Sequence, residues 1–334
     1  MEQEKRWMEQ EKRWMEQEVD YAGVVGENVE ILTRNPKNYY QVIADIENCE
    51  TVTIDGKLFI PETNKPLPLV IIVPGSLGVG PNHKAHAETL VGEGYAVFLL
   101  DPFGARSVKS TIENQTQYSF AASAYDLLVT YQTLSQHPLI DAERIAAQGH
   151  SRGGSAVLTA SMRNFADPII GSDSGFVAVY SVYPWCGHQF KNSQIGDTQV
   201  RAIVGEIDNW VSIKQIETQI EAINRNGGKA AMRIVDGAHH SFDRYEPVHH
   251  MPEARVAPEA PILFLEDSGK MIHPETKQGD PDLVDYDIFV HAMKQGYGRL
   301  GADIGGIDDQ PEIFKKDMLK FYSQHLILEE ATGE

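Results

Sequence analysis

Residues 144–158 read RIAAQGHSRGGSAVL, an apolar run that passes through a Gly-x-Ser-x-Gly motif centred on Ser151. The run predicts a buried strand, and residues 152–164 predict a helix that begins directly after the serine. A strand-to-helix turn this sharp needs small neighbours, because flanking Cβ atoms would collide with nearby backbone, and Gly149 and Gly153 meet that need. The helix start also offers its dipole and free N–H groups to an oxyanion. The stretch therefore predicts a nucleophilic serine at a strand end.

The rest of the chain alternates short apolar strands with amphipathic helices, which is the pattern of a parallel sheet covered by helices. The segment 49–62 instead alternates in polarity and predicts an antiparallel strand pair that turns at Asp55–Gly56. We therefore expect an α/β fold with a doubly wound, mostly parallel sheet. The other predicted strands are 68–76, 95–101, 176–184, 198–208 and 230–243, and the other predicted helices are 82–93, 118–138, 211–228 and 311–326.

Acidic and histidine residues stand where two later strands end. Ligands of such sheets bind beyond the carboxyl ends of the strands, so residues at these ends can meet. Asp208 ends one predicted strand, and His239 and His240 follow the next. The chain order Ser, acid, His predicts a triad in which His240 takes the proton of Ser151 and Asp208 orients the imidazole. Glu206 is the alternative to Asp208, and His239 is the alternative to His240.

The loop after the first buried strand reads PGSLG at residues 74–78. Its glycines allow the backbone to approach a substrate oxygen closely. We expect the backbone N–H groups of Ser76 and Arg152 to form an oxyanion hole, with Leu77 close to the substrate.

Five stretches together carry a resemblance to a known family: PGSLG, LLDPFGARSV, GHSRGG, VGEIDNWV and GAHHSFD. They resemble the dienelactone-hydrolase-like branch of the α/β-hydrolase superfamily over about residues 50 to 328. The resemblance implies an α/β-hydrolase fold, and it favours His240 as the base because the family's base directly precedes a small residue and Phe. True dienelactone hydrolases carry Cys as nucleophile, whereas this chain has Ser151, which favours a serine esterase of the same branch.

Further residues near the strand ends are candidates for the substrate pocket. Arg106 either attracts a substrate carboxylate or forms an ion pair with Asp101 or another buried acid. Trp185 and His188 either wall the acyl pocket or pack in the core, and Trp210 lies near the mouth.

Composition excludes several classes of partner. The 334-residue chain has a formal net charge of −19, which argues against nucleic acid and anionic membranes. Two cysteines make no disulfide framework, and we interpret Cys186 as a buried apolar residue rather than a second nucleophile or metal ligand. Two His pairs and His83-x-x-His86 raise the question of a metal, but HExxH and CxxC motifs are absent from the sequence. We expect no metal, no cofactor and a cytoplasmic location.

The chain begins with a tandem MEQEKRW repeat, and we assign residues 1–20 to a charged heptad extension. Two heptads are too few for a stable coiled coil alone, so a docking or homo-oligomer role and a helix without a role both stay open. We assign residues 21–334 to a single domain. Its segment 243–285 has little periodicity and is either a lid-like insertion or a surface excursion.

These observations predict a serine hydrolase that cleaves carboxylic esters or lactones through an acyl-enzyme. Its partner would be a small ester or lactone substrate. A peptidase or amidase with the same triad is the alternative among enzymes. A binding protein that keeps the fold without turnover is the alternative from another class.

Overall fold

The computed structural model describes residues 17–327, so the MEQEKRW repeats lie outside the described part of the chain. Its main feature is an eight-stranded sheet with the order β11-β10-β8-β7-β5-β6-β4-β3. Neighbours from β11 to β6 pair in parallel, and β4 pairs antiparallel with β6 and β3. This is an α/β-hydrolase arrangement and confirms the predicted fold class. The strands are β3 (Glu27–Arg34), β4 (Thr51–Phe59), β5 (Leu67–Val73), β6 (Ala96–Asp101), β7 (Ile140–His150), β8 (Ala178–Val182), β10 (Gln199–Gly205) and β11 (Lys229–Val235).

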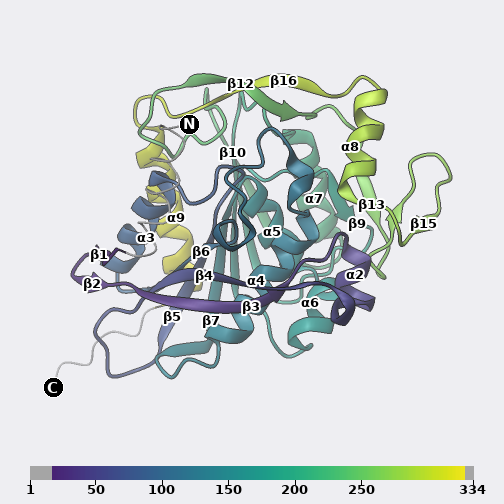
Figure 1. Cartoon of the computed structure of the whole chain (residues 1–334). Coiled ribbons are helices and arrows are strands. Elements are labelled where there is room, and N and C mark those ends of the chain that lie inside the picture. Colours follow the sequence, from purple (N-terminus) through teal and green to yellow (C-terminus); the bar gives the residue numbers. More distant parts are fainter. Residues whose placement is uncertain (1–16, 328–334) are drawn as a thin grey trace.

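Helices cover both faces of the sheet, with α3 and α9 on one side and α4, α5 and α7 on the other (Figure 1). Because both faces are covered, the central strands are apolar throughout, and Val70, Ile71 and Ile72 of β5 are fully buried. Ser119 caps α4 by accepting a hydrogen bond from Ala122 N. The helices are α2 (Tyr39–Ala44), α3 (Pro81–Gly92), α4 (Phe120–Leu134), α5 (Arg152–Ser161), α6 (Arg163–Ile170), α7 (Ile213–Arg225), α8 (Asp285–Lys294) and α9 (Gln310–His325).

The prediction of a strand pair at 49–62 is wrong, because β4 runs straight through Asp55 and Gly56. The glycine there serves close packing rather than a turn. A Cβ on Gly56 would lie 2.3 Å from Phe98 Cζ, so only glycine lets the neighbouring β6 lie this close. One of the two antiparallel partners of β4 is β3, a strand that the sequence pattern did not predict.

The segment 243–285 contains more regular structure than its pattern predicted. Its strand β12 (His249–Val256) pairs antiparallel with β16 (Arg299–Ile304), and β13 (Leu263–Leu265) pairs in parallel with β9 (His188–Phe190). The β12–β16 ribbon lies over one end of the main sheet (Figure 1). These pairings join residues far apart in sequence, so local periodicity did not reveal them. The short strands are β1 (Asp20–Tyr21), β2 (Val24–Val25), β14 (Met271–Ile272) and β15 (Gly279–Asp280).

No helix among residues 17–327 combines the length and the apolar composition that a bilayer span requires.

Candidate active site

Ser151 stands in the sharp turn between β7 and α5. Its backbone has φ 54° and ψ −113°, a conformation that costs a non-glycine residue about 1–3 kcal/mol. A hydrogen bond of 2.9 Å from Ser151 N to Val182 O holds the turn against β8. A Cβ on Gly149 would lie 2.0 Å from the carbonyl oxygen of Gly153, so the strand and the helix can approach this closely only with glycine. The predicted strand-to-helix turn is confirmed.

A hydrogen-bonded chain joins Ser151, His240 and Asp208, which follow the carboxyl ends of three different strands. His240 Nε2 lies 3.0 Å from Ser151 Oγ, and His240 Nδ1 lies 2.7 Å from Asp208 Oδ2. Because a carboxylate only accepts, His240 Nδ1 donates to Asp208, which leaves Nε2 to accept a hydrogen bond from the Ser151 hydroxyl. Asp208 Oδ1 accepts from the N–H groups of Trp210 at 2.8 Å and Val211 at 3.0 Å. These two bonds aim the carboxylate at His240.

The two rival residues lie outside this chain. Glu206 is exposed, and its carboxylate accepts a hydrogen bond of 2.8 Å from Gly237 N. His239 Nδ1 is buried and has no hydrogen-bond partner among the described residues. In this structure Asp208 and His240, rather than Glu206 and His239, belong to the hydrogen-bonded chain with Ser151.

Ser76 and Arg152 both lie beside Ser151 at the rim of the same small cavity. Ser76 is part of a tight turn in which Gly78 N donates to Gly75 O at 3.0 Å. The first N–H groups of a helix have no acceptor within the helix, and Arg152 is the first residue of α5. The structure thus brings both predicted oxyanion residues next to the serine.

Two small cavities adjoin Ser151, with volumes of about 30 Å³ and about 20 Å³. Such volumes hold roughly two water molecules at most. Leu77 lines the smaller cavity. The larger cavity has aromatic walls and one edge formed by the β12 segment, and its lining includes Phe120, Trp185, Trp210, Phe289, Arg255, Val256 and Ala257.

Trp210 and Trp185 both line the larger cavity beside Ser151. The Trp210 ring stacks on His240 with a centroid separation of 5.1 Å and an interplanar angle of 20°. Trp185 stacks on Phe120 at 4.3 Å and closes one side of the larger cavity.

His188 takes the second of the two roles that the sequence left open, because it packs behind Trp185 and does not line the cavity beside Ser151. Its ring centroid is 4.7 Å from that of Trp185, and it lines a separate small cavity together with Cys186 and Tyr39. Burial lowers the pKa of His188 to about 3, so the ring is neutral at pH 7. Burial also raises the pKa of the Cys186 thiol, which suits its predicted role as a buried apolar residue.

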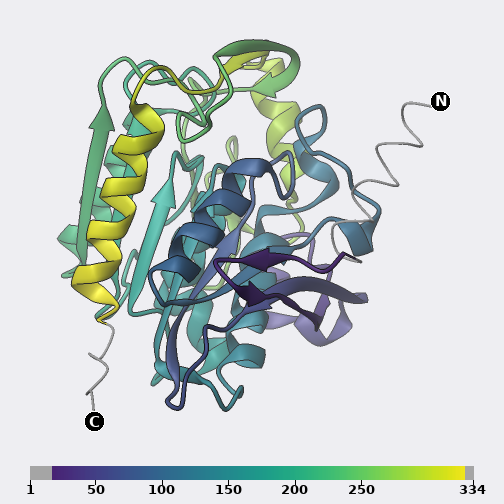
Figure 2. The ribbon, with the colours of Figure 1, turned by 90° about the vertical axis from the view of Figure 1, so that its left-hand side faces the viewer.

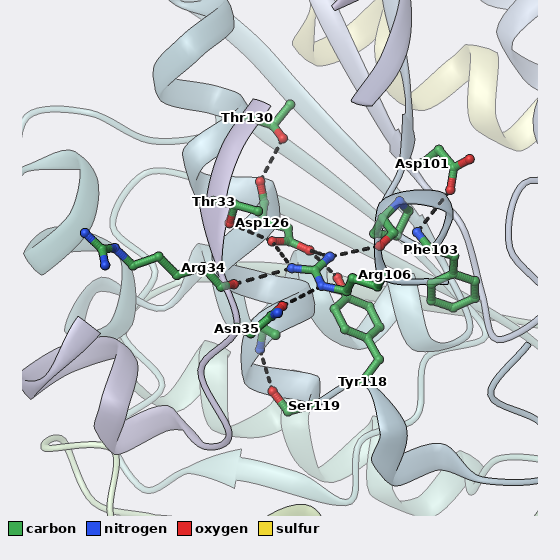
Figure 3. Close-up of polar contacts among 12 residues, drawn as sticks. Thr33, Arg34, Asn35, Asp101, Phe103, Arg106, Tyr118, Ser119, Asp126 and Thr130 are labelled. Carbon is green, nitrogen blue, oxygen red and sulfur yellow. Dashed lines mark hydrogen bonds and ion pairs between the residues drawn. The ribbon is translucent and has the colours of Figure 1, made fainter. Parts of the chain in front are cut away.

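Of the two roles that the sequence left open for Arg106, the structure shows the ion pair with a buried acid and not a place in the pocket beside Ser151. Its guanidinium forms a two-pronged ion pair with the buried Asp126, at 2.7 and 3.0 Å, and donates to Asn35 Oδ1 at 2.7 Å (Figure 3). Asp101, the other partner that the sequence suggested, instead accepts from the N–H of Phe103. The guanidinium is held in this network and takes the structural role that the sequence left open.

The side chain of Arg152 has a role that sequence reasoning missed. It is 2 % exposed, and its guanidinium donates to the carbonyl oxygens of Tyr118 and Gln115. The guanidinium carbon also lies 4.0 Å from the ring centre of Phe120. Burial lowers its pKa to about 10, so it stays charged at pH 7. This cation holds the loop that supplies Phe120 to the pocket wall.

A buried polar cluster lies directly behind Ser151 and was also missed. Asp243 accepts hydrogen bonds from Tyr183 OH at 2.8 Å and from Asn82 Nδ2 at 2.9 Å, and His86 Nε2 lies 2.7 Å from it. Ligand atoms of His86, His150 and Asp243 lie within 4.8 Å of one another, so these residues could hold a metal ion. Hydrogen bonds within the cluster already satisfy the carboxylate. The spacing His83-x-x-His86 was the only sequence signal for it.

Comparisons with known proteins place these features in a family. The model of the dienelactone hydrolase family matches residues 54–260, which is more than half of the chain. A search of curated proteins finds no match to the chain.

The chain is similar to several solved structures of low identity. MGS-M1, an alpha/beta hydrolase from a Medee basin deep-sea metagenome library, has 14 % identity and a TM-score of 0.45, covering 65 % of this chain and 84 % of its own. The propionate-bound esterase Est2 of Thermogutta terrifontis has 15 % identity and a TM-score of 0.45, covering 61 % and 84 %. The dienelactone hydrolase-like promiscuous phosphotriesterase P91 from metagenomic libraries has 14 % identity and a TM-score of 0.45, covering 65 % and 84 %.

Proposed function

Because this chain belongs to the dienelactone hydrolase family, we propose that it cleaves carboxylic esters or lactones with Ser151 as its nucleophile. The observation that carries this proposal is the hydrogen-bonded chain from Ser151 Oγ through His240 to Asp208, at 3.0 and 2.7 Å. A serine becomes a strong nucleophile when an adjacent base takes its proton and a third group orients that base.

In the proposed mechanism, Ser151 Oγ attacks the carbonyl carbon while His240 Nε2 takes the hydroxyl proton. The C–O π electrons move onto the carbonyl oxygen, and the N–H groups of Ser76 and Arg152 donate to that oxyanion. Asp208 stabilises the imidazolium. As the intermediate collapses, the bond to the leaving oxygen breaks, and His240 gives its proton to the leaving alcohol. Water, activated by His240, then attacks the acyl-enzyme and releases the acid.

The size of the site favours small acyl groups. The larger cavity beside Ser151 has only about 30 Å³ of free space, and Trp185, Phe120 and Phe289 bound it. A short acyl chain fits with small shifts of these rings, whereas a long one must displace them. We propose that acetyl and propionyl esters, or small lactones, react faster than long-chain esters.

The domain organisation and the segment 243–285 are part of the proposed function. Residues 21–334 act as one domain, whose segment 243–285 works as a lid, since Arg255, Val256 and Ala257 reach the cavity beside Ser151. The repeats in residues 1–20 have either a docking or homo-oligomer role or no role. Deleting them should leave ester hydrolysis unchanged, while size-exclusion chromatography reports any lost homo-oligomer.

The test is hydrolysis of p-nitrophenyl acetate, butyrate and octanoate by the purified protein, beside Ser151→Ala. Ser161→Ala is the matched control, because this buried serine is the last residue of α5, the helix that follows Ser151, and its hydroxyl donates locally to Leu158 O. We expect activity that falls with chain length, vanishes in Ser151→Ala and survives in Ser161→Ala. Activity retained by Ser151→Ala would refute Ser151 as the nucleophile.

Faster cleavage of acetyl p-nitroanilide than of the acetate ester would favour the amidase. A dihydrocoumarin assay covers lactones, and no turnover of any substrate would favour a binding protein.

A further inference from the structure

A groove lies at the opposite end of the sheet from Ser151. It has a volume of about 720 Å³ and lies between the edge of the sheet and the second half of α9. Figure 2 shows α9, in yellow, alongside the strands of this edge. The groove is lined by Gln199 and Lys229, which are the first residues of β10 and β11, whereas Asp208 and His240 follow the last residues of these strands.

The charge of the groove is opposite to that of the protein. The chain carries a formal net charge of −19, yet five cationic side chains line the groove and Asp317 is the single acid among its lining residues. The cations are Arg201, Lys229, Arg233, Lys316 and Lys320. A hollow lined by one sign of charge focuses the field and concentrates ligands of the other sign.

Two of these cations are held in place by Asp317. Arg201 donates to both carboxylate oxygens, Arg233 Nη1 donates to Oδ1 at 2.7 Å, and Tyr180 OH donates to Oδ2 at 2.9 Å. The Asp317 side chain is 4 % exposed, so the carboxylate is a buried anchor, while the Arg233 side chain remains 40 % exposed to the groove. Two guanidinium groups on one carboxylate leave a net positive charge in a fixed geometry. Such preorganisation reduces the entropy that a ligand must overcome on binding.

Apolar side chains line the same groove. Val200, Ala231 and Phe321 lie among the lining residues beside the cations. The volume is in the range of about 300–1,000 Å³ typical of sites for small molecules. A ligand that fits both features has clustered negative charge and an organic group of moderate size.

We propose that this groove binds a small organic molecule that carries a di- or triphosphate group. Lysine ammonium groups and guanidinium groups are the side chains that bind phosphate oxygens by charge-assisted hydrogen bonds. The exposed Lys316 and Lys320 lie on one side of the groove and Arg233 on the other, so they can contact different oxygens of one polyphosphate. The organic group contacts Phe321 and its apolar neighbours.

The test is isothermal titration of the full chain with ADP and, separately, with sodium tripolyphosphate, at low and at physiological salt. We expect saturable binding of both probes that weakens with salt. Tighter binding of ADP shows that the organic group contributes, and equal affinities show that the phosphates alone are recognised. The absence of saturable binding of either probe at millimolar concentration would overturn the proposal.

Variants locate the binding. Lys316→Gln/Lys320→Gln removes two exposed cations of the groove, and we expect at least about a tenfold loss of affinity, because each lost hydrogen bond to a charged group weakens binding. Lys191→Gln/Lys214→Gln is the matched control, since both lysines are exposed and lie outside the groove. Equal losses in the two pairs would refute this site and indicate non-specific attraction. Neither pair touches the site at Ser151, so ester hydrolysis by both should equal that of the unaltered protein.

Discussion

Replacing Asp208 by Asn tests the proposed hydrogen-bonded chain with little change of shape. The carboxylate accepts three hydrogen bonds, from His240 Nδ1, Trp210 N and Val211 N. In Asp208→Asn the amide oxygen keeps the two backbone bonds at the Oδ1 position. The amide nitrogen then faces His240 Nδ1 as a donor, so the ring must present a lone pair there and carry its proton on Nε2.

The consequence is a base in the wrong tautomer. With a proton on Nε2, His240 cannot accept the proton of Ser151, which lies 3.0 Å away. The imidazolium of the transition state also loses its stabilising carboxylate. We expect kcat for p-nitrophenyl acetate to fall about 10⁴-fold, as found when this tautomer is imposed on a serine hydrolase. That loss corresponds to roughly 5.5 kcal/mol at 1.36 kcal/mol per factor of ten.

Glu206→Gln is the matched control, because this acid lies two residues earlier and binds Gly237 N rather than a histidine. Its kcat should stay within about twofold of the unaltered protein. Both variants should unfold at similar urea concentrations, which separates loss of chemistry from loss of folding. A drop of less than about tenfold in Asp208→Asn would refute the assigned role of the carboxylate, and a large drop in Glu206→Gln would transfer that role to Glu206.

Three further changes test other parts of the site. Phe289→Ala should open the cavity beside Ser151 and raise the octanoate-to-acetate ratio of kcat/KM at least about fivefold, because a long acyl chain no longer has to displace this ring. An unchanged ratio would contradict the placement of Phe289 in the cavity wall. Tyr183→Phe keeps the ring that packs 4.6 Å from His240 but removes the hydroxyl that donates to Asp243. Urea titration should therefore show a loss of about 1–3 kcal/mol in the free energy of unfolding. An unchanged urea midpoint would contradict a stabilising role of the hydrogen bonds around Asp243. Burial lowers the pKa of His150 to about 3, below its unfolded value, so the protein loses stability as the pH falls through about 6.5. In His150→Gln the free energy of unfolding should therefore fall less steeply, by about 1.4 kcal/mol per pH unit between pH 6 and 5. An identical slope in both proteins would contradict a neutral His150.

Local patterns in the sequence were sufficient for the fold class, for most strands of the main sheet and for the helices α3, α4, α5, α7 and α9. The strand β5 is buried on both faces and is therefore apolar throughout, whereas the helix α7 is buried on one face and is therefore amphipathic. Each element can be predicted from its own residues. The Gly-x-Ser-x-Gly turn could also be predicted locally, because the close contact that requires glycine is between Gly149 and Gly153, which lie within five residues of each other. At Gly56 the sequence pattern predicted a turn, whereas the glycine is required by the close packing of Phe98 on the neighbouring strand β6.

The sequence by itself determined that a serine, an acid and a histidine follow strand ends in an order that lets them meet. Only the tertiary structure shows that the carboxylate of Asp208 lies against His240, whereas that of Glu206, the same kind of group two residues earlier, binds Gly237 N. It also decided that Arg106 faces Asp126 instead of the pocket. Each of these outcomes depends on contacts between residues far apart in the chain, and the strength of an ion pair or hydrogen bond depends on distance and burial, which no local pattern encodes.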